Sequence, residues 1–236
     1  SAAAQTLNSP LVLSSASTIQ LGAGAAVSHV LSGQIISAPG VGLTINGTAS
    51  GSTLILTNAS NQLNGTLTIG TDARVQFGNN SAGGIGSRAN IVNNGTLITN
   101  TNNGNLILGN LISGSGNFVQ TRNTVYLTAD NTYAGTTTVG LQAVNAGVSL
   151  RIGNDTYSGM HGTGDITIQA VTGGNSDMRY HLIADNTIAN NITINANTDG
   201  TNARNATLLR QGIGNINLNG NLTIGATNSA PGTQRG

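Results

Sequence analysis

Short segments in which apolar and polar residues alternate recur along the whole chain, and turn-forming residues separate them. In the segment 65–70, Leu67 and Ile69 fall on one side of an extended backbone, and Thr66 and Thr68 fall on the other. Comparable segments lie at 42–47, 52–57, 95–100, 105–110, 123–128, 149–154, 164–169, 190–197, 215–220 and 221–226. This period of two predicts many short strands, each with one buried face.

The composition argues against helices. Every basic residue is Arg and every acidic residue is Asp, so the good helix formers Lys and Glu are absent, while 34 glycines supply turns. The separators between the segments are Gly, Asn, Ser and Asp rather than helical patterns, which excludes alternating strand–helix units. We therefore expect an all-β chain.

Two all-β architectures fit this pattern, a right-handed parallel β-helix and a β-sandwich. A sandwich of this length should use more aromatic residues in its core than the 3% present here, whereas a solenoid needs only thin layers of Leu, Ile and Val. We favour the β-helix, with roughly 22 residues per coil. No change of composition divides the chain, so we expect one β-helical segment over 1–227 and a tail over 228–236.

The charge pattern bears on partners and location. With a net charge of +1 and no cluster of basic residues, the chain lacks the electrostatic surface that nucleic-acid binding requires. No apolar run reaches the roughly 18 residues of a membrane helix, and residues 1–25 do not read as a signal peptide. We expect an export signal, if the parent chain has one, to have been removed or to lie upstream. Disulfides are excluded because there is no Cys.

One stretch resembles a known repeat. From Ile112 the chain reads "ISGSGNFVQTRNTVYLTADNTYAGTTTVGLQ", which is similar to the autotransporter-associated β-strand repeat, also called the passenger-associated transport repeat, here about 112–141. The residues that carry the resemblance are Gly114, Gly116, Leu127, Thr128, Asn131, Thr132, Tyr133, Gly135, Thr137 and Val139. The segment 65–100 also looks like the text that precedes such a repeat. Gln120, where the family usually has Lys, departs from the pattern, as do Ala129 and Asp130.

The resemblance implies both a local structure and a role. Asn131 and Gly135 would form a corner, Tyr133 would lie over it, and the threonines after Gly135 would start the next strand. The family's role implies a passenger of the type V secretion system, which a C-terminal outer-membrane barrel in the parent chain tethers to the surface of a Gram-negative bacterium. Such a segment would help the passenger to cross the outer membrane and to fold.

The sequence offers little chemistry. The seven Asp residues stand singly in turn-like contexts, whereas β-helical polysaccharide lyases and hydrolases need two or three converging carboxylates. The chain has no Gly-Asp-Ser-Gly motif, no Gly-Gly-x-Gly-x-Asp calcium repeat and no His pair at metal spacing. We expect no catalytic residue, no cofactor and no metal site, and we keep a polysaccharide enzyme only as a third reading.

One region is locally rich in polar and aromatic residues. It spans 151–165 and 176–181, and its candidate ligand contacts are Arg151, Asp155, Tyr157, His161, Arg179, Tyr180 and His181. If these lie on neighbouring coils, Tyr and Arg could supply contact area and directional donors for a ligand. The other interpretation is an irregular loop whose polar residues face water.

These observations favour an adhesin stalk or adhesive surface. A long face of Thr, Asn and Ser can make many weak polar contacts at once, so binding would gain from multiplicity. The expected partner is a host-cell surface protein, a matrix protein or a glycan, or the same protein on a neighbouring cell. The alternative is a self-associating structural protein, in which rods pair or stack through uncapped edge strands.

Overall fold

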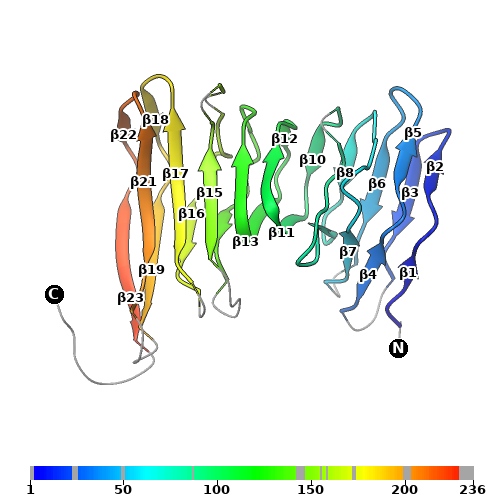
Figure 1. Ribbon diagram of the computed structural model, residues 1–236, viewed down its shortest axis with the longest axis horizontal. Helices are drawn as coiled ribbons and strands as arrows, with labels where there is room; N and C mark the ends of the chain where they lie inside the picture. The colour runs from blue at the N-terminus through cyan, green and yellow to red at the C-terminus, as the bar shows by residue number, and fades with distance from the viewer. Residues whose placement is uncertain are drawn as a thin grey trace.

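The computed structural model describes residues 3–22, 26–48, 51–86, 88–141, 147–154, 156–157, 159–171, 174–198 and 203–228. Within these ranges all regular elements are strands, and they form a right-handed parallel β-helix. Figure 1 shows the strands side by side along the long axis, with the N-terminal strands at one end and the C-terminal strands at the other. The predicted fold class is confirmed. No helix in these ranges has the length and apolar character to cross a membrane.

Parallel strands of successive coils pair in ladders. The first ladder contains β1 (Thr6–Leu7), β4 (Ser28–Leu31), β7 (Thr53–Leu56), β9 (Arg74–Phe77), the first parts of β11 (Thr96–Leu108) and β13 (Asn117–Leu127), β14 (Thr137–Val139), β16 (Ile166–Gln169), β19 (Ile192–Thr198) and β23 (Leu222–Asn228). The second ladder contains the last parts of β11 and β13, then β15 (Val148–Ile152), β17 (Ser176–Leu182) and β21 (Ala206–Gly212). Each coil therefore forms parallel backbone hydrogen bonds with the coil before it.

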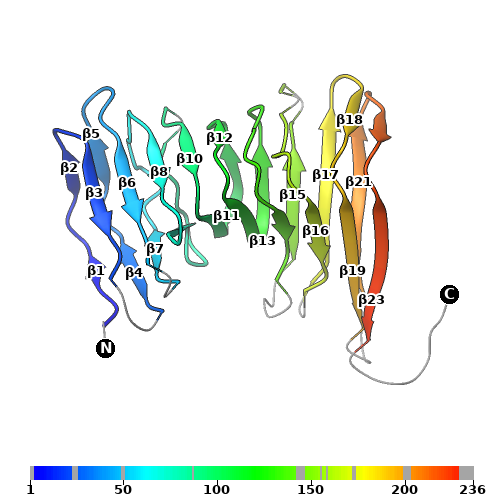
Figure 2. The ribbon, with the colours of Figure 1, turned by 180° about the vertical axis from the view of Figure 1, so that it is seen from behind.

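A third ladder runs along the same axis, as the view from behind in Figure 2 shows. It contains β3 (Ser17–Gln20), β6 (Leu43–Asn46), β8 (Leu67–Ile69), β10 (Ile91–Asn93) and β12 (Ile112–Ser113). Two shorter pairs are β2 (Leu11–Leu13) with β5 (Ile35–Ser37), and β18 (Asn186–Ile188) with β22 (Ile216–Leu218). The short β20 (Ala203–Arg204) pairs antiparallel with β19.

The coils are not of uniform length. Arg74 pairs with Thr96 and Thr96 pairs with Asn117, so these coils take 22 and 21 residues. Ile166 pairs with Ile192 and Ile192 with Leu222, so the later coils take 26 and 30 residues. The expected period of roughly 22 residues is therefore too short for the C-terminal half, where the strands are longer: β19 and β21 have 7 residues each, whereas β9 has 4.

The core is the inside of the coil, where buried side chains of successive strands stack in rows. Leu97 pairs with Val75 on one side and with Phe118 on the other, and all three are fully buried. Tyr133 and Tyr180 are also fully buried. The resemblance places Tyr133 over a corner, but its ring lies inside the coil, 6.2 Å from the ring of Phe118, and its hydroxyl is 2.7 Å from Thr137 Oγ1. Four of the six Phe and Tyr residues, Phe77, Phe118, Tyr133 and Tyr180, thus lie in the core.

A column of glycines lies just before the strands of the first ladder in four successive coils. A Cβ atom on Gly116 would lie 2.3 Å from the carbonyl oxygen of Gly95, and one on Gly135 would lie 2.2 Å from that of Gly116. A Cβ on Gly164 would likewise lie 2.3 Å from the Gly135 oxygen. We call these four residues the glycine column. Its coils approach so closely that only glycine fits, which accounts for Gly116 and Gly135 in the repeat.

Other residues of the repeat are structural as well. Gly114 has a φ of 98° and lies against the carbonyl of Asn93, so a side chain there would be both strained and obstructed. Leu127 and Thr137 are fully buried. Asn131 is buried and joins three coils: its Oδ1 accepts the Ile112 N–H at 2.8 Å, and its Nδ2 donates to the Met160 carbonyl at 2.7 Å. Its side chain replaces backbone pairing where the chain turns.

We expect Asn131→Ala to lower the free energy of unfolding by about 2 kcal/mol, because the buried Ile112 N–H then loses its acceptor. Asn90→Ala is the matched control, since Asn90 is exposed and its side chain has no hydrogen bond within the described ranges. Urea denaturation followed by circular dichroism measures both. Equal midpoints for the two variants would show that the Asn131 side chain does not join the coils.

Candidate functional site

Polar side chains gather on the outward face of the second ladder. The parallel register places Thr124 beside Ser149 and Ser149 beside Asp177. In the next outward row it places Tyr126 beside Arg151 and Arg151 beside Arg179. The intervening residues Val125, Leu150 and Met178 point inward and are fully buried. We call these six outward residues of β13, β15 and β17 the polar band.

Arg151 lies against Tyr126. Its Nη1 donates a hydrogen bond to the Tyr126 hydroxyl at 2.6 Å, and its guanidinium carbon lies 5.1 Å from the centre of the ring, within cation–π range. The Arg151 Nε is buried and has no hydrogen-bond partner among the described residues. The cation is therefore held in place by an aromatic neighbour rather than by a carboxylate in this part of the chain.

Arg179 has a carboxylate partner. Its Nε lies 2.7 Å from Asp177 Oδ1 and its Nη2 lies 3.2 Å from Oδ2, a two-point ion pair. The pKa of Arg179 is raised, mainly by this hydrogen bond to Asp177. The Ser149 hydroxyl donates to the same Asp177 oxygen at 2.6 Å. Within the polar band, Asp177 thus neutralises Arg179 and leaves the charge of Arg151 in excess.

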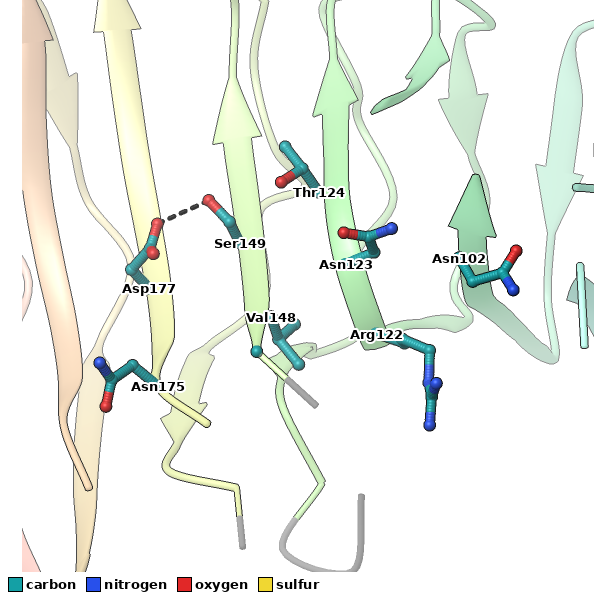
Figure 3. A pocket seen from close by; sticks show the side chains of 9 residues that line it. Asn102, Arg122, Asn123, Thr124, Val148, Ser149, Asn175 and Asp177 are labelled. Atoms are coloured by element: carbon teal, nitrogen blue, oxygen red, sulfur yellow. Dashed lines mark hydrogen bonds between the residues drawn. The ribbon is translucent and has the colours of Figure 1, made fainter. Parts of the chain in front are cut away.

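A hollow of about 530 Å³ lies at one edge of the polar band, and Figure 3 shows it from close by. It is lined by Asn102, Arg122, Asn123, Thr124, Gly147, Val148, Ser149, Asn175 and Asp177. Figure 3 places Asn102 and Arg122 on one side and Asp177 and Asn175 on the other, so the hollow crosses several coils. Arg122 Nη1 donates to Asn80 Oδ1 at 2.5 Å. The lining is mainly amide and hydroxyl groups, suited to a hydroxyl-rich or peptide ligand.

A smaller hollow of about 290 Å³ lies at the Arg151 side of the polar band, and we call it the Arg151 pocket. It is lined by Asn105, Ile107, Tyr126, Arg151, Asn154, Thr156, His181 and Gln211. Five successive coils contribute to it, through β11, β13, β15 with the turn that follows, β17 and β21. A cation, an aromatic ring, an exposed aliphatic side chain and three amides thus converge.

The structure brings together some of the predicted ligand contacts. Arg151 and Arg179 are neighbours on adjacent coils, and Arg151 and His181 line one pocket. Tyr157 is 59% exposed at the end of a turn in which Asn154 Oδ1 accepts the N–H groups of Thr156 and Tyr157. Asp155 lies outside the described residues.

Two predicted contacts are wrong, because Tyr180 and His161 are only 0% and 2% exposed and line no pocket described above, whereas His181, at 9%, still lines the Arg151 pocket. Tyr180 points inward from β17, as Met178 does, so its position follows from strand alternation rather than from a loop. His161 packs edge-on against Tyr180, with ring centres 5.5 Å apart, and its Nδ1 lies 2.6 Å from the Gly162 carbonyl oxygen. Burial lowers the pKa of His161 to about 4, which the Gly162 hydrogen bond partly opposes. Both side chains belong to the core.

Sequence reasoning missed several residues of the site, among them Tyr126, Ser149 and Gln211. Tyr126 precedes Arg151 by one coil, and Gln211 follows His181 by one coil. An alignment of the chain with itself at the coil spacing could have found these pairs. The uneven length of the coils hides that spacing in the sequence.

Within the described residues, no group of three or more His, Cys, Asp or Glu side chains is arranged to hold a metal ion. The comparisons with known proteins give no match: no family model, no characterised protein and no solved structure is similar to this chain at a significant level.

Proposed function

We propose that the chain is a non-enzymatic, surface-exposed segment of a bacterial autotransporter passenger that acts as an adhesin stalk or adhesive surface. The observation that carries the proposal is the coil-on-coil architecture, in which the residues of 112–141 that resemble the passenger-associated repeat fix the packing of successive coils. The parent chain would supply the outer-membrane barrel, and the segment would stand outside a Gram-negative cell.

Coil-on-coil pairing suits a chain that is exported unfolded. Each coil contacts mainly its neighbours, so folding can start at one coil and propagate along the chain. Gly116 and Gly135 permit the close stacking of consecutive coils, and Asn131 bonds to the coils before and after its own. A segment of this kind would fold coil by coil as it leaves the outer membrane. Because the folded coils could not slide back, folding would favour outward transport.

The outward face of the second ladder supports an adhesive role. The polar band places hydroxyl, carboxylate, guanidinium and phenol groups on neighbouring strands, and a hollow lies on each side of it. Such a surface can form many weak contacts at once, which suits binding to a host-cell protein, a matrix protein or a glycan. Tyr and Arg are also enriched at protein interfaces.

The direct test is to display the chain on a non-adherent bacterium through a heterologous outer-membrane barrel. We expect the displaying cells to attach to epithelial cells several-fold more than cells that display the barrel alone, without clumping. Attachment no greater than the barrel control would overturn the adhesive role.

Self-association is a second candidate, which exposed apolar residues at both ends of the described stack favour. Leu7 and Val12 are 47% and 69% exposed in the first coil, and Leu222 and Ile224 are 48% and 74% exposed in the last strand. Copies could stack end to end through these surfaces. A single monomeric species in sedimentation velocity across a hundredfold concentration range would exclude this candidate.

A further inference from the structure

The charge of the Arg151 pocket is its most informative property. Arg179 is engaged by Asp177 through two hydrogen bonds, but the residues that line the Arg151 pocket include no carboxylate in the described part of the chain. The Arg151 Nη1 donates a hydrogen bond to the Tyr126 hydroxyl, and the Arg151 Nε has no hydrogen-bond partner among the described residues. The Arg151 side chain as a whole is half-buried, so its guanidinium charge borders the pocket with no described carboxylate to neutralise it, and an anion there would gain a charge-assisted hydrogen bond. The pocket is therefore prepared for an anion.

The other side chains of the Arg151 pocket indicate the chemistry of the neutral part of the ligand. Ile107 is 59% exposed and pairs with Tyr126, so an aliphatic side chain borders the pocket beside the aromatic ring. Asn105, Asn154 and Gln211 contribute amides, and Thr156 contributes a hydroxyl. Asn154 uses its Oδ1 for the turn, so its Nδ2 remains as a donor. Amides and a hydroxyl around an apolar wall match a ring with hydroxyl groups at its edge and C–H groups on its face.

We propose that the Arg151 pocket binds one anionic sugar unit, a ring that carries a carboxylate or a sulfate, at the end of a surface glycan. Arg151 pairs with the anionic group, the amides bond the ring hydroxyls, and Ile107 packs on its C–H face. At about 290 Å³ the pocket is at the small end of ligand sites, which fits a single ring. The inference rests on the proposed adhesive function and names its ligand class.

The test measures binding of sialyllactose, lactose 6′-sulfate and lactose to the purified protein by calorimetry. We expect the anionic sugars to bind at least tenfold more tightly than lactose, with affinity that falls as salt is raised. Preference for sialyllactose would identify a carboxylate as the natural group, and preference for the sulfated sugar would identify a sulfate. Anionic sugars that bind no better than lactose would overturn the proposal.

Three variants place the binding in this pocket. Arg151→Gln removes the charge, and Gln211→Glu adds a repelling carboxylate on an exposed position of β21, where folding should be unaffected. We expect each to weaken binding of the anionic sugar at least tenfold. Arg122→Gln is the control, because Arg122 has the same charge but lines the other hollow. Unchanged affinity in both pocket variants, with the melting temperature retained, would refute the site.

The outcomes separate this inference from the proposed function. Displayed cells that attach equally well with and without Gln211→Glu would leave the adhesive function standing and remove the anionic-sugar pocket. If the purified protein binds the anionic sugar but the displaying cells do not attach, the anionic-sugar pocket stands and the adhesive function is removed.

Discussion

Alanine in place of Gly135 is expected to lower the free energy of unfolding by about 3 kcal/mol or more, among the largest effects of a single substitution. The new Cβ would lie 2.2 Å from the carbonyl oxygen and 2.4 Å from the carbonyl carbon of Gly116. Both obstructing atoms are backbone, so no side-chain rotation can relieve the clash, and the two coils must move apart. Urea denaturation followed by circular dichroism measures the loss.

Gly109→Ala is the matched control for the glycine column. A Cβ at Gly109 would meet its nearest atom, Thr128 Oγ1, at 3.5 Å, an ordinary contact distance. We expect the control to change stability by less than about 1 kcal/mol, since it adds one methyl group at an uncrowded position. If Gly135→Ala is as stable as this control, the coils do not stack as closely as the glycine column requires.

The second large effect concerns acid stability. His161 is 2% exposed, and burial lowers its pKa from 6.5 to about 4. Between these two pH values the unfolded chain binds a proton on His161 that the folded protein does not, so stability falls as the pH falls through this window. The loss is about 3 kcal/mol in total and is complete near pH 4. Above pH 6.5 His161 is neutral in both states and contributes no pH dependence to the stability.

His161→Leu isolates this contribution from the other titrating groups. Leucine has no proton to bind and removes the buried Nε2, which has no hydrogen-bond partner among the described residues. Urea denaturation of both proteins at several values between pH 7 and pH 4 gives the difference in stability. We expect wild type to lose about 3 kcal/mol more than the variant over this range. Parallel pH profiles would mean that His161 reaches water in the folded protein.

Much of the fold could be predicted from strand periodicity. The alternation in 65–70 placed Leu67 and Ile69 inside correctly, and both are fully buried in the structure. The coil spacing could not be predicted with the same success, because longer strands, such as β19 and β21 with 7 residues each, enlarge the C-terminal coils to as many as 30 residues between Ile192 and Leu222. Local alternation shows which residues face inward, but it does not show how many residues a coil takes.

The site was predictable only in part, for a related reason. Arg151 and Arg179 were recognised because polar residues cluster around them in the sequence, and the structure places them side by side. The sequence predicts Tyr180 and His161 as ligand contacts because polar and aromatic residues are concentrated in this region, whereas β17 continues its alternation through Tyr180 and both side chains are buried. Tyr126 was missed because its contact with Arg151 depends on pairing between coils.

The central proposal is that stacked coils fold one upon another outside the cell, and protease resistance on intact bacteria tests it most directly. The chain is displayed through a heterologous barrel as wild type, Gly135→Ala and Gly109→Ala, and the amount and resistance of surface protein are measured. We predict that wild type and Gly109→Ala reach the surface as resistant protein, while Gly135→Ala arrives in smaller amount or is cleaved. Equal amounts of equally resistant protein for all three would contradict the claim.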